Sequence, residues 1–339
     1  MSKLPSRWHA AAALSGRIDL SQAVLVHPGR VAALSPAQLQ DLGVSRTHAL
    51  RLSRGTPLTS PHPYLTLDDA AYPEALRPLP FAPPVLFHLG DQGLLKAPVA
   101  VAIVGARSCT HDGRRMARAL ARAVEAAGGV VVSGMAHGID TAAHLAAPGR
   151  TIAVLGHGLA VARTEAAERT AQRILGAGGL LLSEFPPTFP AARHTFPQRN
   201  RVIAGLAQLT VVVEASLRSG AGITARLALD AGREVGAVPG SPYAKASAGC
   251  LALLSQGAAL IRGPADLLGL LGLPIAPAPG DTGPPLDPLL AALDPSGTPF
   301  DTLMTRVEMP ASALAAALGA LELQGRVKRL PGGRFLRIG

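Results

Sequence analysis

The sequence contains 339 residues, which is enough for two or three domains. Hydrophobic residues make up 48% of it and aromatic residues only 3%, so a core has to be built mainly from Ala, Leu and Val. Two cysteines and the lack of an apolar run of about 18 residues argue against a disulfide framework, a structural zinc site and a membrane span. With 32 Lys and Arg against 22 Asp and Glu, the formal net charge of +10 favours a polyanionic partner. From the low cysteine content and the lack of a membrane span, we expect a cytoplasmic protein.

The N-terminal residues 1–58 are predicted to form a small helical domain of the SAM or helix-hairpin-helix type. The stretch PAQLQDLGVSRTHALRL carries apolar residues at helical spacing around one Gly break. The Pro-rich residues 56–99 are expected to connect this segment to the next domain and to pack against that domain. The reason is that they carry large apolar side chains: Tyr64, Tyr72, Phe81, Leu86 and Phe87.

Strands and helices alternate from residue 98 to about residue 271. Six short runs rich in Val, Leu and Ile lack polar alternation, as is typical of strands buried on both faces: VAIVG, VVVSG, TIAVLG, GLLLSE, LTVVVEA and EVGAVPG. After the first run, Met116, Leu120, Val124 and Ala127 form one apolar stripe of a helix. We predict an α/β domain over residues 59–272, an extended Rossmann-like, doubly wound parallel sheet that binds ligands at the carboxyl ends of its strands.

Residues 273–285 are rich in Pro and Gly and are predicted to be a linker. Within residues 286–339, helices over Pro299–Val307 and Pro310–Gln324 and a hairpin around Pro331–Gly333 give the order of a winged-helix-like domain. The second helix has no Lys or Arg, although major-groove recognition normally needs Arg, Asn or Gln on this helix. The basic residues lie on the hairpin instead, so we favour a protein contact or a weak contact with a DNA backbone over sequence readout.

Polar or glycine-rich loops follow the predicted strands, and a helix begins after most of these loops. Helix N-termini carry free N–H groups and the positive ends of dipoles, so their convergence at one rim predicts binding of one or more phosphates. The first loop holds Arg107, which suits either a bidentate contact with phosphate or a salt bridge to Glu184 or Glu214. In the second loop, Asp140 could accept from a sugar or a base, but we favour a helix cap.

The stretch HTFPQRNRVIAGLA, from His194, places Arg199 and Arg201 around Asn200 at the start of an apolar helix. Cations at a helix N-terminus are unfavourable, so either an internal carboxylate or an anionic ligand has to compensate them. The sequence leaves both alternatives open. Phe196 is placed to stack on a base, although packing in the core is the commoner role of such a ring.

Motifs for catalysis and for metal binding are weak in this sequence. There is no Walker A motif, and GAGITA at Gly220–Ala225 matches a dinucleotide fingerprint only formally, because no acidic residue follows the next strand. His137 and His144 have no third ligand at helical spacing, and no Ser-His-Asp or Cys-His set stands out. We therefore expect no metal, no cofactor and no catalytic residue.

Taken in order, the motifs resemble those of the DNA-processing protein A (DprA, or Smf) family. The matching pieces are AYPEALRPLPFAPPVLFHLG, IVGARS, VVSGMAHGIDTAAH, TIAVLGHGL, LLSEFPP, FPQRNRVIAGL, VVVEASLRSGAGITARLALDAGREVGAVPG and a late GAALI. They cover about residues 70–262, and the winged-helix-like segment fits the same family. The combination is specific, whereas no single piece is.

The resemblance implies a non-enzymatic recombination mediator that binds and protects single-stranded DNA. It further implies a homodimer that loads the RecA recombinase during natural transformation (competence) and DNA repair, with the single-strand-binding protein as another candidate partner. Carried over to this sequence, the loops of the family's DNA pocket, together with Phe196, give these predicted contacts: Gly105, Ala106, Arg107, Ser108, Gly134, His137, Gly138, Asp140, Phe196, Arg199, Asn200, Arg201, Ser219, Gly220 and Ala221.

Two features depart from the family pattern. Ala106 replaces the hydroxyl residue of a Gly-Ser/Thr-Arg loop, which removes one donor to phosphate. After GHGL, a segment that usually contains Tyr-Pro and Asn is replaced by AVARTEAAERTAQRI, in which Arg163 is the residue that offers substitute charge.

Two other functions fit parts of the sequence. Lysine-decarboxylase-like phosphoribohydrolases share a similar glycine-rich Rossmann core, and such a nucleotide hydrolase would need Glu184 or Glu214 as its catalytic carboxylate. A winged-helix regulator of duplex DNA with a ligand-sensing core is the third hypothesis. The uncharged second helix of the C-terminal domain counts against it.

Overall fold

The computed structural model describes residues 2–4, 12, 33–53, 58–274, 288–294, 296–307, 309–323 and 325–338. The chain divides into two compact units, Met1–Ile275 and Ala276–Gly339. Within the described residues, no helix is both long enough and apolar enough to cross a membrane.

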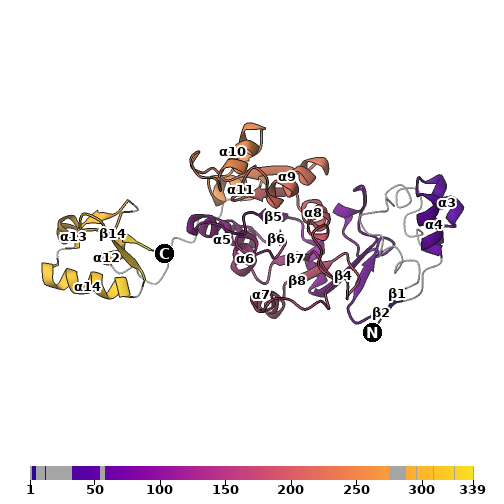
Figure 1. Cartoon of the computed structure of the whole chain (residues 1–339), viewed down its shortest axis with the longest axis horizontal. Helices are drawn as coiled ribbons and strands as arrows, with labels where there is room; N and C mark the ends of the chain where they lie inside the picture. Colours follow the sequence, from indigo (N-terminus) through magenta and orange to yellow (C-terminus); the bar gives the residue numbers. More distant parts are fainter. Residues whose placement is uncertain are drawn as a thin grey trace. The chain divides into compact units, whose positions relative to one another are not determined.

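A nine-stranded sheet forms the centre of the first unit (Figure 1), in the order β11-β10-β9-β5-β6-β7-β8-β4-β3. The six apolar runs of the sequence form parallel strands: β5 (Ala100–Val104), β6 (Val130–Ser133), β7 (Thr151–Leu155), β8 (Leu180–Ser183), β9 (Leu209–Val212) and β10 (Glu234–Ala237). The short β11 (Ala259–Leu260) extends the parallel part beyond β10. The predicted Rossmann-like, doubly wound α/β fold is confirmed.

Both faces of the sheet are covered, because its central strands are apolar at successive positions. In β5, Val101 and Ile103 belong to one buried cluster, and Ala102 and Val104 belong to the other. The first cluster also takes residues from α5 (His111–Ala126), α6 (Ile139–Ala146) and α11 (Pro264–Leu270). The second takes residues from α7 (Glu165–Gly176), α8 (Thr195–Leu206), α9 (Gly220–Asp230) and α10 (Ala248–Ser255).

The Pro-rich segment that was predicted to be a connector adds two strands to this sheet. β4 (Val85–Gly90) pairs antiparallel with β8, and β3 (Tyr64–Thr66) pairs antiparallel with β4. Two single turns of 3₁₀ helix flank β4, η2 (Glu74–Leu76) and η3 (Gln92–Lys96). Tyr72 and Phe87 are buried, as packing against the domain requires, whereas Phe81 is 43% exposed. β4 was not predicted as a strand, because it is a short, mainly apolar run directly after two prolines and shows no polar alternation.

The described N-terminal residues include two helices where apolar spacing predicts them, α3 (Pro36–Asp41) and α4 (Arg46–Ser53). α3 begins with a capping box, in which the Ser35 hydroxyl accepts from the Gln38 N–H and the Gln38 side chain accepts from the Ser35 N–H. β1 (Ser2–Leu4) pairs antiparallel with β2 (Leu58–Ser60). Most of residues 1–32 of the predicted helical domain lie outside the described residues.

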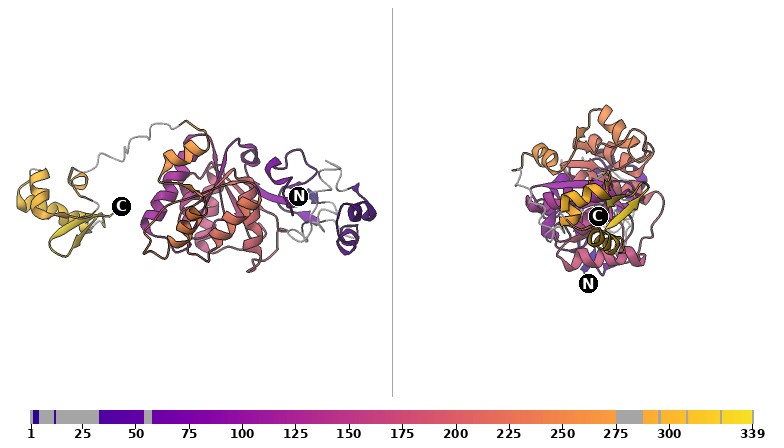
Figure 2. Two further views of the ribbon diagram at one scale, coloured as in Figure 1. Left: turned by 90° about the horizontal axis from the view of Figure 1, so that it is seen from above. Right: turned by 90° about the vertical axis from the view of Figure 1, so that its left-hand side faces the viewer.

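The second unit has the predicted winged-helix order and is drawn in yellow in Figure 2. α13 (Phe300–Val307) and α14 (Ala311–Leu323) precede a hairpin of β13 (Val327–Leu330) and β14 (Arg334–Arg337). α12 (Pro288–Ala291) and β12 (Thr298–Pro299) complete the unit, and β12 pairs with β14. Its buried core includes Leu303, Leu314, Leu318 and Phe335. Most of the predicted linker, residues 273–285, lies outside the described residues.

Candidate nucleic-acid interface

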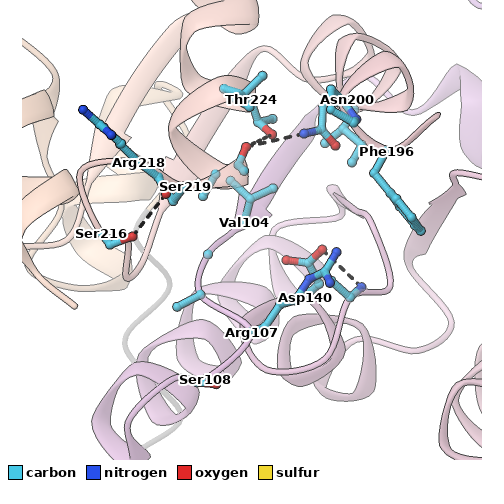
Figure 3. A pocket seen from close by; sticks show the side chains of 18 of the residues that line it. Val104, Arg107, Ser108, Asp140, Phe196, Asn200, Ser216, Arg218, Ser219 and Thr224 are labelled. Atoms are coloured by element: carbon cyan, nitrogen blue, oxygen red, sulfur yellow. Dashed lines mark hydrogen bonds between the residues drawn. The ribbon is translucent and has the colours of Figure 1, made fainter. Parts of the chain in front are cut away.

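The strand order reverses next to β5. β6, β7 and β8 lie on one side of β5, and β9, β10 and β11 lie on the other, so the loops that follow β5 and β9 diverge. Such a reversal leaves a crevice at the carboxyl ends of the strands. A cavity of about 730 Å³ lies there, lined by the loops after β5, β6, β9 and β10 and by the first turns of α8 and α9 (Figure 3).

The cavity brings together eleven of the fifteen predicted contact residues from four separate segments of the chain. Four come from the loop after β5, one from α6, three from α8 and three from the start of α9: Gly105, Ala106, Arg107, Ser108, Asp140, Phe196, Arg199, Asn200, Ser219, Gly220 and Ala221. Gly134, His137, Gly138 and Arg201 are not among the lining residues.

Arg107 is exposed at the wall of the cavity. Its guanidinium carbon lies 5.7 Å from the ring centroid of Phe196, which is a cation–π contact, and it makes no ion pair with another described residue. The two carboxylates that could have neutralised it have other partners. Glu184 pairs with Arg201, and Glu214 accepts from the backbone N–H of Thr110 at 2.9 Å and from the Thr110 hydroxyl. Arg107 is therefore available to an anionic ligand.

Gly105 and Gly138, in the loops after β5 and β6, are required by close packing between these two loops. A Cβ atom on Gly105 would lie 2.7 Å from the Cγ1 atom of Ile139. Gly138 has φ +92° and a Cβ there would lie 2.4 Å from the carbonyl oxygen of Ala106. The Ile139 N–H donates to the same carbonyl at 3.3 Å. The loop after β5 and the loop after β6 are thus locked together, and this packing positions Arg107.

Asp140 does not cap α6, so the prediction of a helix cap is wrong. α6 begins at Ile139 and its N-cap residue is Gly138. The buried carboxylate of Asp140 instead accepts from the backbone N–H groups of Gly134 at 3.1 Å and Ala136 at 3.3 Å, which fixes the loop before the helix. Burial raises the pKa of Asp140, and the nearby Arg199 guanidinium opposes this shift.

The two histidines of this loop region have different environments. His144 is fully buried; its Nε2 accepts from the Met135 N–H at 3.3 Å, and its Nδ1 lies 2.7 Å from the Thr151 hydroxyl. Burial lowers the pKa of His144 to about 3, so this imidazole is neutral at pH 7. His137 is exposed. Among the described residues, no group of three or more His, Cys, Asp and Glu side chains is arranged to hold a metal ion.

Arg199 is only 5% exposed, and its hydrogen bonds go to the protein itself. Its Nη1 donates to the carbonyl oxygens of Gly134, at 2.7 Å, and Val154, and its Nε donates to the Asn200 side chain at 3.2 Å. Burial lowers the pKa of Arg199 to about 10, which leaves it charged at pH 7. Backbone carbonyls at the ends of β6 and β7 thus compensate the cation at the start of α8.

The sequence also left open what compensates the charge of Arg201. Arg201 forms an ion pair with Glu184, whose side chain is fully buried. A phosphate contact by Arg199 or Arg201 stays a prediction. In the structure, the guanidinium group of Arg199 donates to backbone carbonyls, and that of Arg201 pairs with the Glu184 carboxylate. Arg163, the suggested substitute for the altered loop, also has internal partners. Its Nη1 donates to Glu168 at 2.9 Å, and its Nη2 donates to the Leu159 carbonyl at 3.0 Å.

The start of α9 offers unused backbone donors. The Ser219 hydroxyl caps the helix by accepting from the Gly222 N–H at 3.1 Å, and the Asn200 amide donates to the Gly220 carbonyl at 3.4 Å. The N–H groups of Gly220 and Ala221 have no acceptor among the described residues. A Cβ atom on Gly220 would meet nothing within 4 Å, so there is open space in front of this helix terminus.

Three basic residues outside the predicted contact set also line the cavity: Arg193, Arg218 and Lys245. All three are exposed, and none forms an ion pair with another described residue. Arg218 stands directly before Ser219, so its place after a strand was a usable signal. Arg193 directly precedes the HTFPQRNRVIAGLA stretch, so its position was a usable signal as well, whereas Lys245 lies in the loop beyond the motif that ends at Gly240. Asp140 is the one acidic side chain among the described residues that line the cavity.

Comparisons with known proteins cover both units of the chain. The family model for DNA recombination-mediator protein A matches residues 63–272, and the model for the DprA winged helix domain matches residues 274–333. Protein Smf of Escherichia coli (strain K12) is 38% identical over 292 residues, which cover 82% of this chain and 78% of that protein.

Two solved structures are similar over most of their own length. The X-ray structure of DprA from Streptococcus pneumoniae has 34% sequence identity and a TM-score of 0.62, and the match covers 78% of this chain and 97% of that chain. A structure of DNA processing protein A from Helicobacter pylori, described for its single-stranded DNA binding mode, has 31% identity and a TM-score of 0.57. That match covers 63% of this chain and 98% of the other.

Proposed function

The chain belongs to the DNA recombination-mediator protein A family, and we propose that it binds single-stranded DNA in the cavity at the carboxyl ends of β5 and β9. One observation carries this proposal. Four exposed cations without an ion pair among the described residues line the cavity, whereas its one lining carboxylate is buried: Arg107, Arg193, Arg218 and Lys245 against Asp140. Such an excess of positive charge on a concave surface attracts a polyanion.

The roles of the residues follow from their exposure. Arg107 offers a bidentate contact to a phosphate, and the N–H groups of Gly220 and Ala221 offer further donors at a helix N-terminus. Phe196 is partly exposed and lies beside Arg107, which suits stacking of a base next to a phosphate contact. Arg199 and Asp140 act as positioning residues, since their hydrogen bonds hold the loops that form the wall.

The wider role is that of a recombination mediator. Membership of the family supports a function in which the chain, as a homodimer, hands the bound strand to the RecA recombinase during transformation and repair. The proposal is non-enzymatic. The hydrolase alternative requires Glu184 or Glu214 as a catalytic carboxylate, and both have internal partners: Glu184 pairs with Arg201, and Glu214 holds Thr110.

A competition gel shift with single- and double-stranded oligonucleotides at several salt concentrations tests the proposal. We expect preference for the single strand, because splayed bases can enter a crevice that a duplex cannot. Arg107→Ala should weaken binding to all single-strand sequences and reduce the salt slope by about 0.7, the value for one phosphate contact on a single strand.

Arg122→Ala is the matched control, because Arg122 is exposed on α5 and lines none of the described cavities. It should change neither affinity nor slope. An Arg107→Ala slope equal to that of the wild type would remove Arg107 from the phosphate contacts. Equal affinity for duplex and single strand would contradict the proposed function.

A further inference from the structure

Two helices begin where the strand order reverses, and their N-termini have different surroundings. α5 follows β5, and α9 follows β9. In a dinucleotide-binding Rossmann domain, the pyrophosphate lies on the N-terminus of the helix after the first strand. β5 is the first parallel strand of this sheet along the chain, so α5 is the helix on which such a domain would hold a phosphate.

The cavity opens to α9 and stops short of α5. The N-cap residue and first turns of α9 line it (Figure 3): Ser219, Gly220, Ala221, Ile223 and Thr224. In the loop after β5, by contrast, Ser108 is the last residue that lines the cavity. All of α5 lies within the described residues, and none of its residues is in the lining. The concave surface is therefore displaced from the usual phosphate position of a Rossmann domain.

A carboxylate from another strand stands at the N-terminus of α5. Glu214, which follows β9, accepts from the N–H of the N-cap residue Thr110 at 2.9 Å and from the Thr110 hydroxyl. The Thr110 hydroxyl oxygen in turn accepts from the Gly113 N–H at 3.0 Å. The N–H groups of His111 and Asp112 have no acceptor among the described residues. α5 thus has free donors of the kind that hold a phosphate, with a carboxylate beside them.

Gly113 makes room for this carboxylate. A Cβ atom on Gly113 would lie 2.5 Å from the Cδ atom of Glu214 and 2.6 Å from its Oε1 atom. The carboxylate therefore lies directly against the first turn of α5, and a larger residue at position 113 would displace it. Glycine weakens a helix relative to alanine, and at this position it is required by the approach of Glu214.

The charge of Glu214 is not cancelled by a neighbouring cation. Among the described residues it forms no ion pair with Lys, Arg or His. Asp112, in the first turn of α5 itself, pairs with Arg115 at 3.5 Å. A phosphate on α5 would lie close to the unpaired Glu214 carboxylate, and like charges at such distances repel. The first turn of α9 contains no acidic residue, so no such repulsion arises there.

We propose that Glu214 is a specificity residue of the single-strand site. It fills the position at which a Rossmann domain receives a nucleotide phosphate, and so confines phosphates to Arg107 and the start of α9. A free nucleotide loses its main phosphate position in this way, whereas a DNA strand keeps several contacts along the rim. This inference rests on the proposed function, because it explains why the site takes a strand and rejects a nucleotide.

The experiment measures ADP binding by equilibrium dialysis and oligothymidylate binding by fluorescence anisotropy, both with the full chain. Glu214→Gln removes the charge and keeps an oxygen that can accept from Thr110, so the loop stays anchored. We expect ADP to bind this variant at least about tenfold more tightly than it binds the wild type, because a like charge beside the phosphate is gone. Oligothymidylate should bind the variant at least as tightly as the wild type, for the same reason.

Glu125→Gln is the matched control. Glu125 lies near the other end of α5 and forms no ion pair with a described residue, so its replacement should leave ADP affinity unchanged. Equal gains in ADP affinity in both variants would show that net charge and not position is responsible, and would overturn the inference. If Glu214→Gln binds ADP no more tightly than the wild type does, Glu214 is only a structural cap and the inference is wrong.

A measurement on the wild type makes the test independent of how the variant folds. In a TROSY NMR titration with oligothymidylate, the amide signals of Gly220 and Ala221 should shift more than those of His111 and Asp112, because the phosphates lie on α9. Larger shifts at His111 and Asp112 would place the strand on α5 and overturn the inference. Failure of the wild type to bind oligothymidylate would contradict the proposed function itself, and the comparison of ADP binding does not depend on that result.

Discussion

The cavity has a floor and a rim that use similar side chains in opposite ways. In the floor, by which we mean the lining residues Asp140, Arg199 and Asn200 together with the fully buried His144, which does not itself line the cavity, each polar group is buried and is bonded to neighbouring protein groups. On the rim, which consists of Arg107, Arg193, Arg218 and Lys245, the cations are exposed and form no ion pair with a described residue. An arginine close to a phosphate loop is therefore not automatically a contact for the ligand. What matters is whether its donors are already used.

The largest expected effect is a difference in the free energy of unfolding between a variant of the floor and a variant of the rim. Arg199→Ala should lower the free energy of unfolding by about 3–5 kcal/mol, because it removes the cation from a buried site and leaves the Asp140 carboxylate without its compensating charge. Urea unfolding followed by circular dichroism measures this loss. Arg107→Ala, on the rim, should change the same quantity by no more than about 0.5 kcal/mol. Similar losses for the two variants would abolish the distinction between floor and rim.

A second prediction concerns the glycine that joins the two regions. Gly138→Ala should destabilise the fold by about 1–3 kcal/mol, because an L-residue at φ +92° is strained and its Cβ would meet the Ala106 carbonyl. It should also weaken single-strand binding, since the displaced Ala106 precedes Arg107. Gly128→Ala is the matched control: Gly128 also has positive φ, but a Cβ there meets nothing within 4 Å. Equal DNA affinity for both variants would mean that the loop packing does not position Arg107.

Much of the fold followed from local sequence, whereas the division between floor and rim did not. Buried parallel strands are apolar at successive positions, so all six were visible, and the order of their loops placed Arg107 and Ser219 at one edge. The fate of Arg199 depends on carbonyls of Gly134 and Val154, 65 and 45 residues away in sequence. No local pattern encodes such a contact. Lys245 was missed for the same reason, because the course of its loop is set by tertiary packing.

The third prediction uses pH to probe the floor. The pKa of His144 is about 3 in the folded protein and 6.5 as its ordinary value, so between these pH values the unfolded chain binds a proton that the folded protein does not. Stability should therefore fall as the pH drops below 6.5, by up to about 1.4 kcal/mol per pH unit from this group. Asp140 acts in the opposite direction, because its raised pKa favours proton uptake by the folded state.

His144→Gln isolates the histidine contribution, since Asp140 is present in both proteins. The unfolding free energy of this variant should depend less steeply on pH between about 6 and 4 than that of the wild type. His137→Gln, on the exposed side of the same loop region, is the control for replacing a histidine. A wild-type slope that His144→Gln leaves unaltered would show that the buried imidazole is not kept neutral by its site.

The smallest effects are expected for replacement of single cations of the rim. They show which parts of the rim contact the strand. Arg193→Ala and Lys245→Ala should each reduce the salt slope of single-strand binding by about 0.7, with stability changed by no more than about 0.5 kcal/mol. These two residues come from loops on different sides of the cavity, before α8 and after β10, so a reduction in both variants would mean that the strand contacts both walls at once. A reduction in only one would confine the strand to that wall. Anisotropy titrations at three or more salt concentrations, with Arg122→Ala as the charge-matched control, measure these slopes, and a slope change in the control of the same size would show that the effect follows net charge and not position on the rim.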